Sequence, residues 1–297
     1  MLTHEINAAF RKRLDKGGAL LMPGAANAMA ARMITDLGFE AIYLSGAGLT
    51  NTYLGMPDLG FVSLPEIAQH TATIRNVTDL PLVVDADTGF GNALNVRHTI
   101  RTLERAGASA IQLEDQVNPK RCGHFSGKDV VDLEEARSRI KAAVDAREDP
   151  NLLIVARTDA RATRGFDEAI DRAAAFVEDG ADITFVEAPE SMEEIRRIPQ
   201  RLAGIPQLVN LVVGGRTPII KLEELDRMGF GLVLYANVAL QGALLGMERA
   251  LSTLKEDGKL DEDGPVASFA TRQKTVQKGL HDALEARYAP KPQLRAV

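Results

Sequence analysis

The chain has one cysteine and no long apolar run, and each absence excludes a class of protein. Cys122 stands alone, so no disulfide can form within the chain, which is typical of a reducing compartment. No run of about 18 apolar residues exists, so we expect no membrane-spanning helix. The first residues, Met1–Lys16, alternate charged and apolar side chains and lack the apolar core of a secretory signal. We therefore expect a cytoplasmic protein.

Neither sign of charge is in large excess. The net charge is −6 over 297 residues, and no block of like charge occurs. Such a chain has no electrostatic attraction for DNA, RNA or anionic membranes, so we expect none of them as partners. The length suits two ordinary domains or one large α/β barrel.

Short apolar runs alternate with longer amphipathic segments along the chain. The runs are mostly continuous, which is typical of strands covered on both faces in a parallel sheet. Segments between them carry apolar residues at three- and four-residue spacing, which predicts helices. The predicted strands are Ala19–Met22, Ala41–Ser45, Leu80–Asp85, Ala110–Glu114, Leu152–Arg157, Ile183–Glu187, Gln207–Leu211 and Gly231–Tyr235. The predicted helices are Ala26–Leu37, Leu64–Asn76, Leu94–Ala106, Leu133–Glu148, Phe166–Asp179, Met192–Leu202 and Leu222–Met228.

Eight such strand–helix units predict an α/β fold of the (β/α)8 TIM-barrel type, with a doubly wound open sheet as the alternative. No Pro/Gly/Ser-rich linker interrupts the chain, so we expect a single domain over 1–297. Within it, 256–297 is expected to form a C-terminal helical extension. Its helical part, about Val266–Tyr288, packs either on a neighbouring subunit or on its own barrel.

Polar residues repeatedly stand where the predicted strands end. In a barrel the carboxyl ends of the strands form the active site. Carboxylates that converge there repel one another unless a cation lies among them. Oxygen ligands predominate, which favours Mg²⁺, or Mn²⁺, over Zn²⁺. Mg²⁺ usually takes one or two carboxylates directly, so Asp85 or Asp87 could bind it and Glu114 or Asp58 could act through water.

Arg157 is the cation among these strand ends. Its planar guanidinium matches a carboxylate in two places, so we predict that it binds a substrate carboxylate. The alternative is a structural ion pair with Glu187 or Asp159.

The loop after the fourth predicted strand reads Lys120-Arg121-Cys122-Gly123-His124. Cationic neighbours lower the pKa of a thiol and can make it an acid, a base or a nucleophile. Gly123 and Gly127 would let the loop move as a lid. The alternative is an inert cysteine.

Four strings in order resemble the isocitrate lyase/phosphoenolpyruvate mutase superfamily. They are Tyr-Leu-Ser-Gly at 43–46, Val-Asp-Ala-Asp-Thr-Gly at 84–89, Leu-Glu-Asp-Gln at 113–116 and Lys-Arg-Cys-Gly-His at 120–124. The last string is the signature of the lyase members. The resemblance runs from about residue 23 to residue 255. It implies a TIM barrel whose last helix is often exchanged between subunits, so we expect a homo-oligomer, a dimer of dimers.

The resemblance also implies a site. It implies Mg²⁺ held by Asp85 and Asp87, with Asp58 and Glu114 in support. It implies Cys122 as the catalytic thiol, with Arg157 and His124 stabilising the developing charge and Tyr43 as a candidate base. The implied substrate contacts come from Ser45, the backbone at Gly46 and Ala47, Gly123, Arg157, Glu187 and Asn210.

The implied reaction breaks the C2–C3 bond of a 2-hydroxy di- or tricarboxylate, of the 2,3-dimethylmalate or 2-methylisocitrate type. The products are a 2-oxo acid such as pyruvate and an enediolate that Cys122 protonates. Two departures favour a dicarboxylate. Relative to methylisocitrate lyases, Val213 lies in the loop where they carry an acidic residue, and Gln241 stands where they carry an arginine for the third carboxylate. Arg272 is a candidate for a second such arginine.

Three alternatives stay open. One is a carboxyphosphonoenolpyruvate mutase-like phosphonate enzyme. Another is an oxaloacetate hydrolase or decarboxylase, although Tyr235-Ala236-Asn237 lacks the serine expected near the end of the eighth strand. The third is a non-catalytic barrel that binds metal and carboxylate, against which Cys122 and Arg157 count.

Overall fold

The eight predicted strands form a closed parallel barrel. The structure is a computed structural model that describes residues 1–123 and 127–290. Its strands pair in the order β1 to β8, and β8 pairs with β1 to close the ring. The TIM-barrel prediction is confirmed, and the open sheet is excluded. The strands are β1 (Leu20–Ala25), β2 (Ile42–Leu44), β3 (Leu82–Asp85), β4 (Ala110–Glu114), β5 (Leu153–Thr158), β6 (Ile183–Val186), β7 (Gln207–Asn210) and β8 (Leu232–Tyr235).

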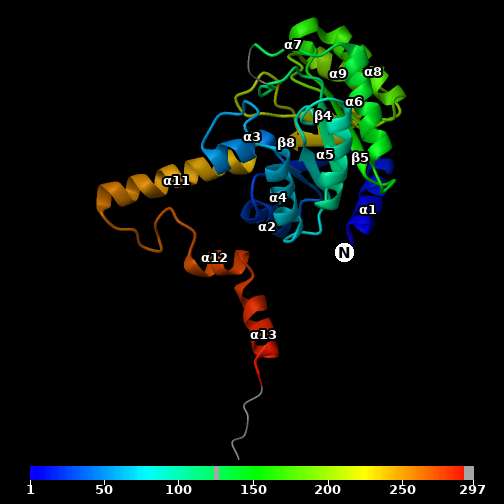
Figure 1. Ribbon diagram of the computed structural model, residues 1–297. Coiled ribbons are helices and arrows are strands. Elements are labelled where there is room, and N and C mark those ends of the chain that lie inside the picture. The colour runs from blue at the N-terminus through cyan, green and yellow to red at the C-terminus, as the bar shows by residue number, and fades with distance from the viewer. Residues whose placement is uncertain (124–126, 291–297) are drawn as a thin grey trace, which may run out of the picture. The chain divides into compact units, whose positions relative to one another are not determined.

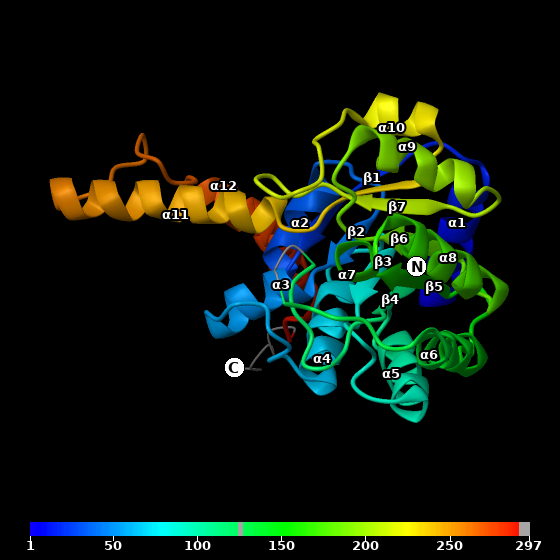
Figure 2. The same cartoon turned by 90° about the horizontal axis from the view of Figure 1, so that it is seen from above.

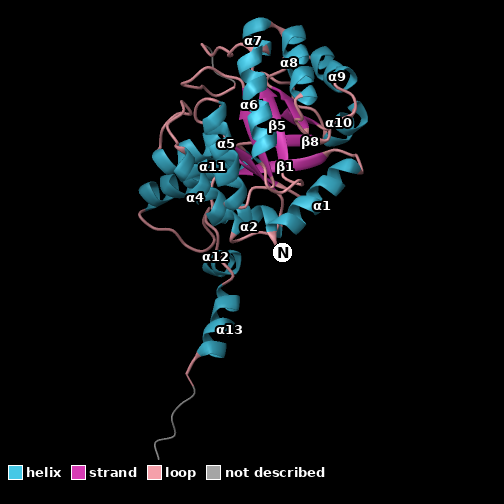
Figure 3. Ribbon diagram, turned by 45° about the vertical axis from the view of Figure 1, so that its right-hand side comes forward, coloured by secondary structure: helices cyan, strands magenta, loops and turns pink. Residues whose placement is uncertain are grey.

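Helices surround the strands, as Figures 1 and 2 show for the barrel, and in Figure 3 the strands lie inside this shell. Short segments after β2 and β5, which include a π-helix, η1, were not predicted. The helices before β8 are α1 (Thr3–Asp15), α2 (Ala28–Asp36), α3 (Gly46–Leu49), η1 (Thr50–Leu54), α4 (Leu64–Arg75), α5 (Ala93–Arg105), α6 (Leu133–Ala146), α7 (Arg161–Arg164), α8 (Phe166–Glu178), α9 (Met192–Arg201) and α10 (Leu222–Met228). Those after it are α11 (Val238–Asp257), α12 (Phe269–Thr275) and α13 (Lys278–Tyr288).

Alternation along the strands decides which side chains enter the barrel. In β5, Leu153 and Val155 belong to the cluster inside the barrel, whereas Ile154 and Ala156 pack outward under the helices. A period of two therefore turns Arg157 inward at the end of the same strand. The same alternation applies to Asp85 after Val83 in β3. Polar residues at the strand ends thus converge on one rim.

Helix α1 covers the opposite end of the barrel. Phe10 and Leu14 belong to the interior cluster together with Leu20 and Leu153, the first residues of β1 and β5. Arg11 adds a hydrogen bond from Nη2 to Asp182 Oδ1 at 2.9 Å, just before β6. The beginnings of the strands are therefore closed by this helix.

Internal contacts divide the chain into two compact units. Unit 1 is Met1–Gln241 and contains the barrel, and unit 2 is Gly242–Val297. The helical segment expected over Val266–Tyr288 consists of two helices, because Gln277 between them takes a left-handed conformation with φ 55°. A single domain with an extension from residue 256 stays a prediction. None of the helices in the described part of the chain is long and apolar enough to cross a membrane.

Gly24, in β1, lies close against the backbone of Ala236, the residue after β8. A Cβ built on Gly24 would lie 1.8 Å from the carbonyl oxygen of Ala236. We predict that Gly24→Ala lowers the free energy of unfolding by about 1–3 kcal/mol or more, because the backbone must move to make room. Urea unfolding measures this. Gly242→Ala is the control, since a Cβ at Gly242 would meet no atom within 4 Å and the φ of this residue is not positive; an equal loss in both variants would contradict the prediction.

Candidate active site

A cavity of about 220 Å³ is formed at the carboxyl ends of the strands. Its lining includes the apolar side chains of Phe185, Val212 and Leu234. It also includes most of the residues predicted from the sequence. The predicted residues that line it are Tyr43, Ser45, Ala47, Asp58, Asp85, Cys122, Gly123, Arg157, Glu187 and Asn210.

Asp85 is held by three groups of its own rim. Its Oδ2 accepts a hydrogen bond from Gly46 N at 3.2 Å, and its Oδ1 accepts from Gln112 Nε2 and from Asp87 N. A Cβ on Gly46 would lie 3.1 Å from both Asp85 Oδ2 and Asp87 Oδ1. A glycine at this position therefore lets the backbone come close to the two carboxylates.

Lys120 lies between two of the predicted metal ligands. Its Nζ is 2.5 Å from Asp58 Oδ1 and 2.8 Å from Asp87 Oδ1, and its side chain is only 5% exposed. Burial raises the pKa of Asp87 to about 7, although Lys120 partly opposes this rise. The pKa of Lys120 is raised, because the carboxylates around it outweigh the effect of its burial. The sequence interpretation placed Lys120 among the cationic neighbours of Cys122 and did not predict its contacts with Asp58 and Asp87.

The residues fit a hard divalent cation that keeps water ligands. In the described part of the chain, no three or more His, Cys, Asp or Glu side chains form a ready-made metal site. The donors at the rim are nonetheless all oxygen atoms, the choice of Mg²⁺ in proteins. The Lys120 ammonium between Asp58 and Asp87 shows that positive charge is stabilised there. Glu114 Oε1 is buried and has no hydrogen-bond partner among the described residues.

Arg157 forms the ion pair with Asp159 that the sequence offered as an alternative, and it also lines the cavity. Its Nη1 lies 3.1 Å from Glu114 Oε2, and its Nε lies 3.0 Å from Asp159 Oδ2. It also lies over the Phe185 ring, 5.3 Å from the centroid, and lines the cavity. Burial would raise the pKa of Asp159, but Arg157 and Lys128 lower it to about 2. The ion pair thus fixes the guanidinium at the edge of the cavity.

Cys122 lies at the cavity, half-buried, and its backbone N–H donates to Asp58 O at 3.3 Å. The next residue, Gly123, is seated closely on the rim. A Cβ there would lie 2.1 Å from Glu187 Oε1 and 2.5 Å from Arg157 Nη2. His124 lies outside the described residues.

Tyr43 is buried in the barrel, and its hydroxyl donates to Gln112 Oε1 at 2.9 Å. Burial raises the pKa of this phenol well above its ordinary value, and the nearby Asp85 carboxylate raises it further. The phenol therefore stays protonated at neutral pH. This disfavours Tyr43 as the base and suits it as a hydrogen-bond donor.

Two more polar groups complete the rim. Ser45 Oγ hydrogen-bonds Asn237 Oδ1 at 3.1 Å and accepts from Gly48 N at 3.0 Å. Asn237, which the sequence interpretation did not select, also lines the cavity. Asn210 Oδ1 is buried without a hydrogen-bond partner in the part of the chain that the structure describes. It is therefore available to a ligand.

The two departures from the methylisocitrate lyases lie in contact. Gln241 Nε2 is 3.5 Å from the carbonyl oxygen of Val213, and Val213 lines the cavity. Both side chains are uncharged. Of the described cavity-lining side chains, Arg157 is the one that carries positive charge.

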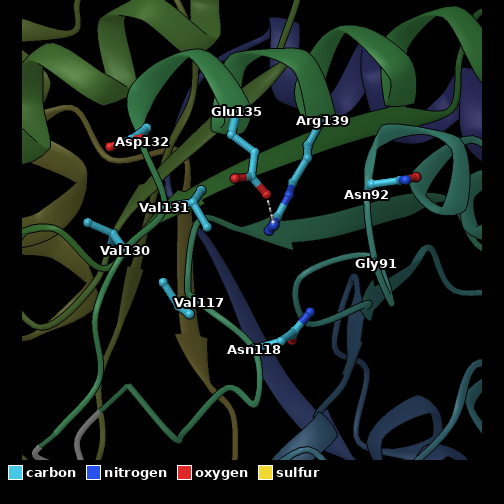
Figure 4. Close-up of a pocket in the computed structure, with 9 residues that line it drawn as sticks. All are labelled: Gly91, Asn92, Val117, Asn118, Val130, Val131, Asp132, Glu135 and Arg139. Atoms are coloured by element: carbon cyan, nitrogen blue, oxygen red, sulfur yellow. Dashed lines mark hydrogen bonds and ion pairs between the residues drawn. The ribbon is translucent and has the colours of Figure 1, made fainter.

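A second cavity, of about 480 Å³, lies behind the loop that follows β4. Figure 4 shows Glu135 and Arg139 of α6 pointing toward each other in it, and Arg139 Nη2 lies 2.5 Å from Glu135 Oε1. It contains none of the residues predicted for the site. Its lining consists of Gly91, Asn92, Val117, Asn118, Val130, Val131, Asp132, Glu135 and Arg139.

Comparison with known proteins places this geometry among characterised enzymes. The family model described as phosphoenolpyruvate phosphomutase matches residues 10–255. The 2,3-dimethylmalate lyase of Eubacterium barkeri is 44% identical over 250 residues, covering 84% of this chain and 86% of that protein. The 2-methylisocitrate lyase of Aeropyrum pernix is 45% identical over 248 residues, covering 84% and 79%.

Solved structures agree with these relatives. A crystal structure of 2,3-dimethylmalate lyase, described as a PEP mutase/isocitrate lyase superfamily member, superposes with a TM-score of 0.91 at 33% identity, covering 100% of this chain and 99% of that one. A phosphonopyruvate hydrolase in complex with oxalate and Mg²⁺ superposes with a TM-score of 0.86 at 30% identity, covering 97% and 99%.

Proposed function

This chain belongs to the phosphoenolpyruvate mutase/isocitrate lyase superfamily, and from that membership we propose that it is a metal-dependent carbon–carbon lyase acting on a 2-hydroxy dicarboxylate. The observation that carries the proposal is the position of Cys122 and Gly123. They line the same cavity as Arg157 and Asp85, so a thiol, a guanidinium and a carboxylate cluster face one small volume. Its relatives named 2,3-dimethylmalate lyase and 2-methylisocitrate lyase support this class of reaction.

We propose that Asp85 and Asp87 hold Mg²⁺, or Mn²⁺, with Asp58 and Glu114 in support. When bound, the metal would supply a Lewis acid at the carboxylate end of the substrate. Lys120 contacts both Asp58 and Asp87, so loading the metal requires this ammonium to share or leave its position. Asp85 needs no such change, because backbone and Gln112 donors already orient it.

The residues of the chain then bind and orient the substrate. Asp159 pairs with Nε and Nη2 of Arg157, at 3.0 and 3.1 Å, and Glu114 pairs with Nη1. A substrate carboxylate would therefore meet the remaining N–H groups of Nη1 and Nη2, on a guanidinium whose plane is fixed. Polar contacts come from Ser45, the backbone at Gly46 and Ala47, Gly123, Glu187 and Asn210.

Cys122 is the proposed proton donor. When the C2–C3 bond breaks, the electron pair remains on the fragment that carried C3, as an enediolate. The Sγ proton of Cys122 moves to that carbon and leaves a second carboxylic acid product. Arg157 and His124 stabilise the negative charge on the fragment. The proton of the C2 hydroxyl passes to a base on the polar rim, so the other product is a 2-oxo acid such as pyruvate.

The cavity favours an alkylated malate over a tricarboxylate. A third carboxylate would need a second cation, and Gln241 and Val213 are uncharged. A carboxylate left without a partner in a buried site costs about 2–5 kcal/mol. Phe185, Val212 and Leu234 offer apolar surface for alkyl substituents.

The test is a substrate panel assayed with Mg²⁺, in which the oxidation of NADH by a coupled dehydrogenase reports pyruvate. The panel contains 2,3-dimethylmalate, other alkylmalates, 2-methylisocitrate, isocitrate and oxaloacetate. We expect the highest kcat/KM with an alkylmalate. Activity with phosphonates alone would overturn the lyase proposal, and activity with oxaloacetate alone, followed by oxalate release, would indicate a hydrolase instead.

Removal of metal gives an independent prediction. Treatment with EDTA is expected to abolish turnover, and Mg²⁺ or Mn²⁺ is expected to restore it, whereas Zn²⁺ is not, because the donor set is oxygen only. Asp85→Asn, which keeps the shape but loses the charge, is expected to raise the Mg²⁺ concentration needed for half-maximal activity. Full turnover in EDTA after dialysis would remove the metal from the proposal.

We further propose that the protein is a homo-oligomer, a dimer of dimers, that resides in the cytoplasm. No described residue of unit 2 is buried, and its helices expose apolar side chains such as Leu244, Leu251 and Phe269. Such surface usually marks an interaction site. Light scattering during gel filtration measures the mass, and a monomer at micromolar concentration would contradict the proposal.

A further inference from the structure

Lys128 connects the Cys122 segment to the barrel rim. Its Nζ donates to the carbonyl oxygen of Gly123, in a short contact, and to Asp159 Oδ1 at 2.6 Å. The side chain of Lys128 is only 2% exposed and that of Asp159 is 0% exposed. A buried ammonium that meets both a carboxylate and a backbone carbonyl fixes the distance between the two chain segments.

The anchor at Asp159 is itself rigid. Its backbone N–H donates to Asp115 Oδ1 at 2.9 Å, and Asp115 Oδ2 accepts from Thr158 Oγ1 at 2.7 Å. Arg172 contributes to the same carboxylate, with Nη1 at 3.3 Å from Asp115 Oδ2. Lys128 therefore links Gly123 to Asp159, whose position is fixed by contacts from strand β5 and helix α8.

Gly123 tolerates little displacement on the side that faces Arg157. The Cβ position of Gly123 already overlaps Glu187 Oε1 and Arg157 Nη2. On the other side, the N–H of Cys122 reaches Asp58 O at 3.3 Å. The segment is also attached before Cys122, because Arg121 N donates to Gln116 Oε1 at 2.9 Å and Arg121 O accepts from Gln116 Nε2 at 2.8 Å. Lys120 pairs with Asp58 and Asp87. Lys128 adds a charged attachment at Gly123 itself.

We propose that Lys128 is a positioning residue, which holds Cys122 and Gly123 against Arg157 and so sets where the Cys122 thiol meets the substrate. Its part in turnover rests on the proposed lyase function. Its part in holding the segment does not, because it follows from contacts with Gly123 and Asp159 alone. The two parts can therefore be tested separately.

The first measurement is alkylation of the thiol. Cys122 is the sole cysteine, so the rate of iodoacetamide labelling reports on this position alone. The pH profile separates the thiol pKa, its midpoint, from accessibility, its plateau. We expect Lys128→Met to raise the plateau rate at least about threefold, because the segment opens more often when its charged attachment is lost. Lys128→Arg, which keeps charge and donors, is expected to restore most of the wild-type rate.

The second measurement is turnover of the best panel substrate. We expect Lys128→Met to lower kcat at least about tenfold with little change in KM, because a small displacement of a catalytic group is costly. Lys141→Met is the control, since the Lys141 side chain is 56% exposed on α6 and its ion pair is with Asp179, at 3.4 Å. It is expected to match the wild type in both measurements.

The outcomes distinguish the two proposals. If folded Lys128→Met shows the wild-type alkylation plateau, the positioning role is wrong, whatever the activity. If the wild type cleaves no panel substrate, the lyase proposal fails, while the alkylation rates still decide the role of Lys128. Should Lys128→Met not fold, Lys128→Gln, which keeps one donor but cannot span both partners, is judged by the same criteria.

Discussion

Replacing Cys122 with serine is expected to lower kcat by about 10²–10⁴-fold, the usual contribution of a positioned acid or base. Serine keeps the size and the polarity, but its hydroxyl gives up a proton far less readily than a thiol does. The measurement is steady-state pyruvate formation from the best panel substrate. KM should change much less than kcat, because the substrate is held by Arg157 and by the metal site.

Two controls accompany this variant. Cys122 is half-buried and outside the apolar core, so the melting temperature of Cys122→Ser should equal that of the wild type. Calorimetric binding of Mg²⁺, proposed for the carboxylates of the rim, should also persist. Unchanged turnover across the panel would take Cys122 out of the mechanism and revive the alternative of an inert cysteine.

Replacing Arg157 is expected to have two separable effects. Arg157→Met removes the cation that pairs with both Glu114 and Asp159 and leaves Asp159 with Lys128, and breaking such a buried pair costs about 3–5 kcal/mol of folding stability. Arg157→Lys keeps the charge but loses the planar fork. It should therefore retain most of the stability and still lose about 10²-fold in kcat/KM, because a carboxylate is no longer held at two points.

Urea unfolding and the coupled assay together measure these effects. Arg105→Met is the matched control. Arg105 pairs with Glu148 at 3.1 Å, and the two side chains are 68% and 53% exposed, so its loss should leave both stability and turnover nearly unchanged. Full kcat/KM in Arg157→Lys would show that charge alone suffices at this position.

The rim was predictable from the sequence because two regular patterns coincide there. Continuous apolar runs identify buried parallel strands, and the polar residue that ends each run must lie at the carboxyl end of its strand. Alternation then directs Asp85 and Arg157 inward, as the inner positions of Val83 and Val155 imply. No long-range information was needed.

The carboxylate partners of Lys120 and Lys128 could not be predicted from the sequence, for a physical reason. Both lie in the irregular segment after β4, where no period relates position in the sequence to direction in space. Their long side chains reach Asp58 and Asp159, 62 and 31 positions away along the chain. The sequence contains a string of cations there, but only the fold shows which carboxylate each one meets.

Helix α1 was missed although its signal is present. Ile6, Phe10 and Leu14 recur at a spacing of four, as expected for one face of a helix, and all three are buried. In the sequence, Met1–Lys16 was considered only as a possible secretory signal. Its apolar face had no predicted partner, because the opening at the start of the strands becomes evident only once the barrel is closed.

That closure has a kinetic consequence. With Phe10 and Leu14 packed at the bottom of the barrel, the described residues leave the cavity open at the rim that carries Cys122. A cleavage that makes two products must then release both through this opening. The product that lies nearer the opening leaves before the product that lies deeper in the cavity. The product released last should therefore compete with substrate for the free enzyme. The product released first should instead bind the enzyme that still holds the other product. Inhibition patterns measured with each product in turn would thus reveal which end of the substrate enters first.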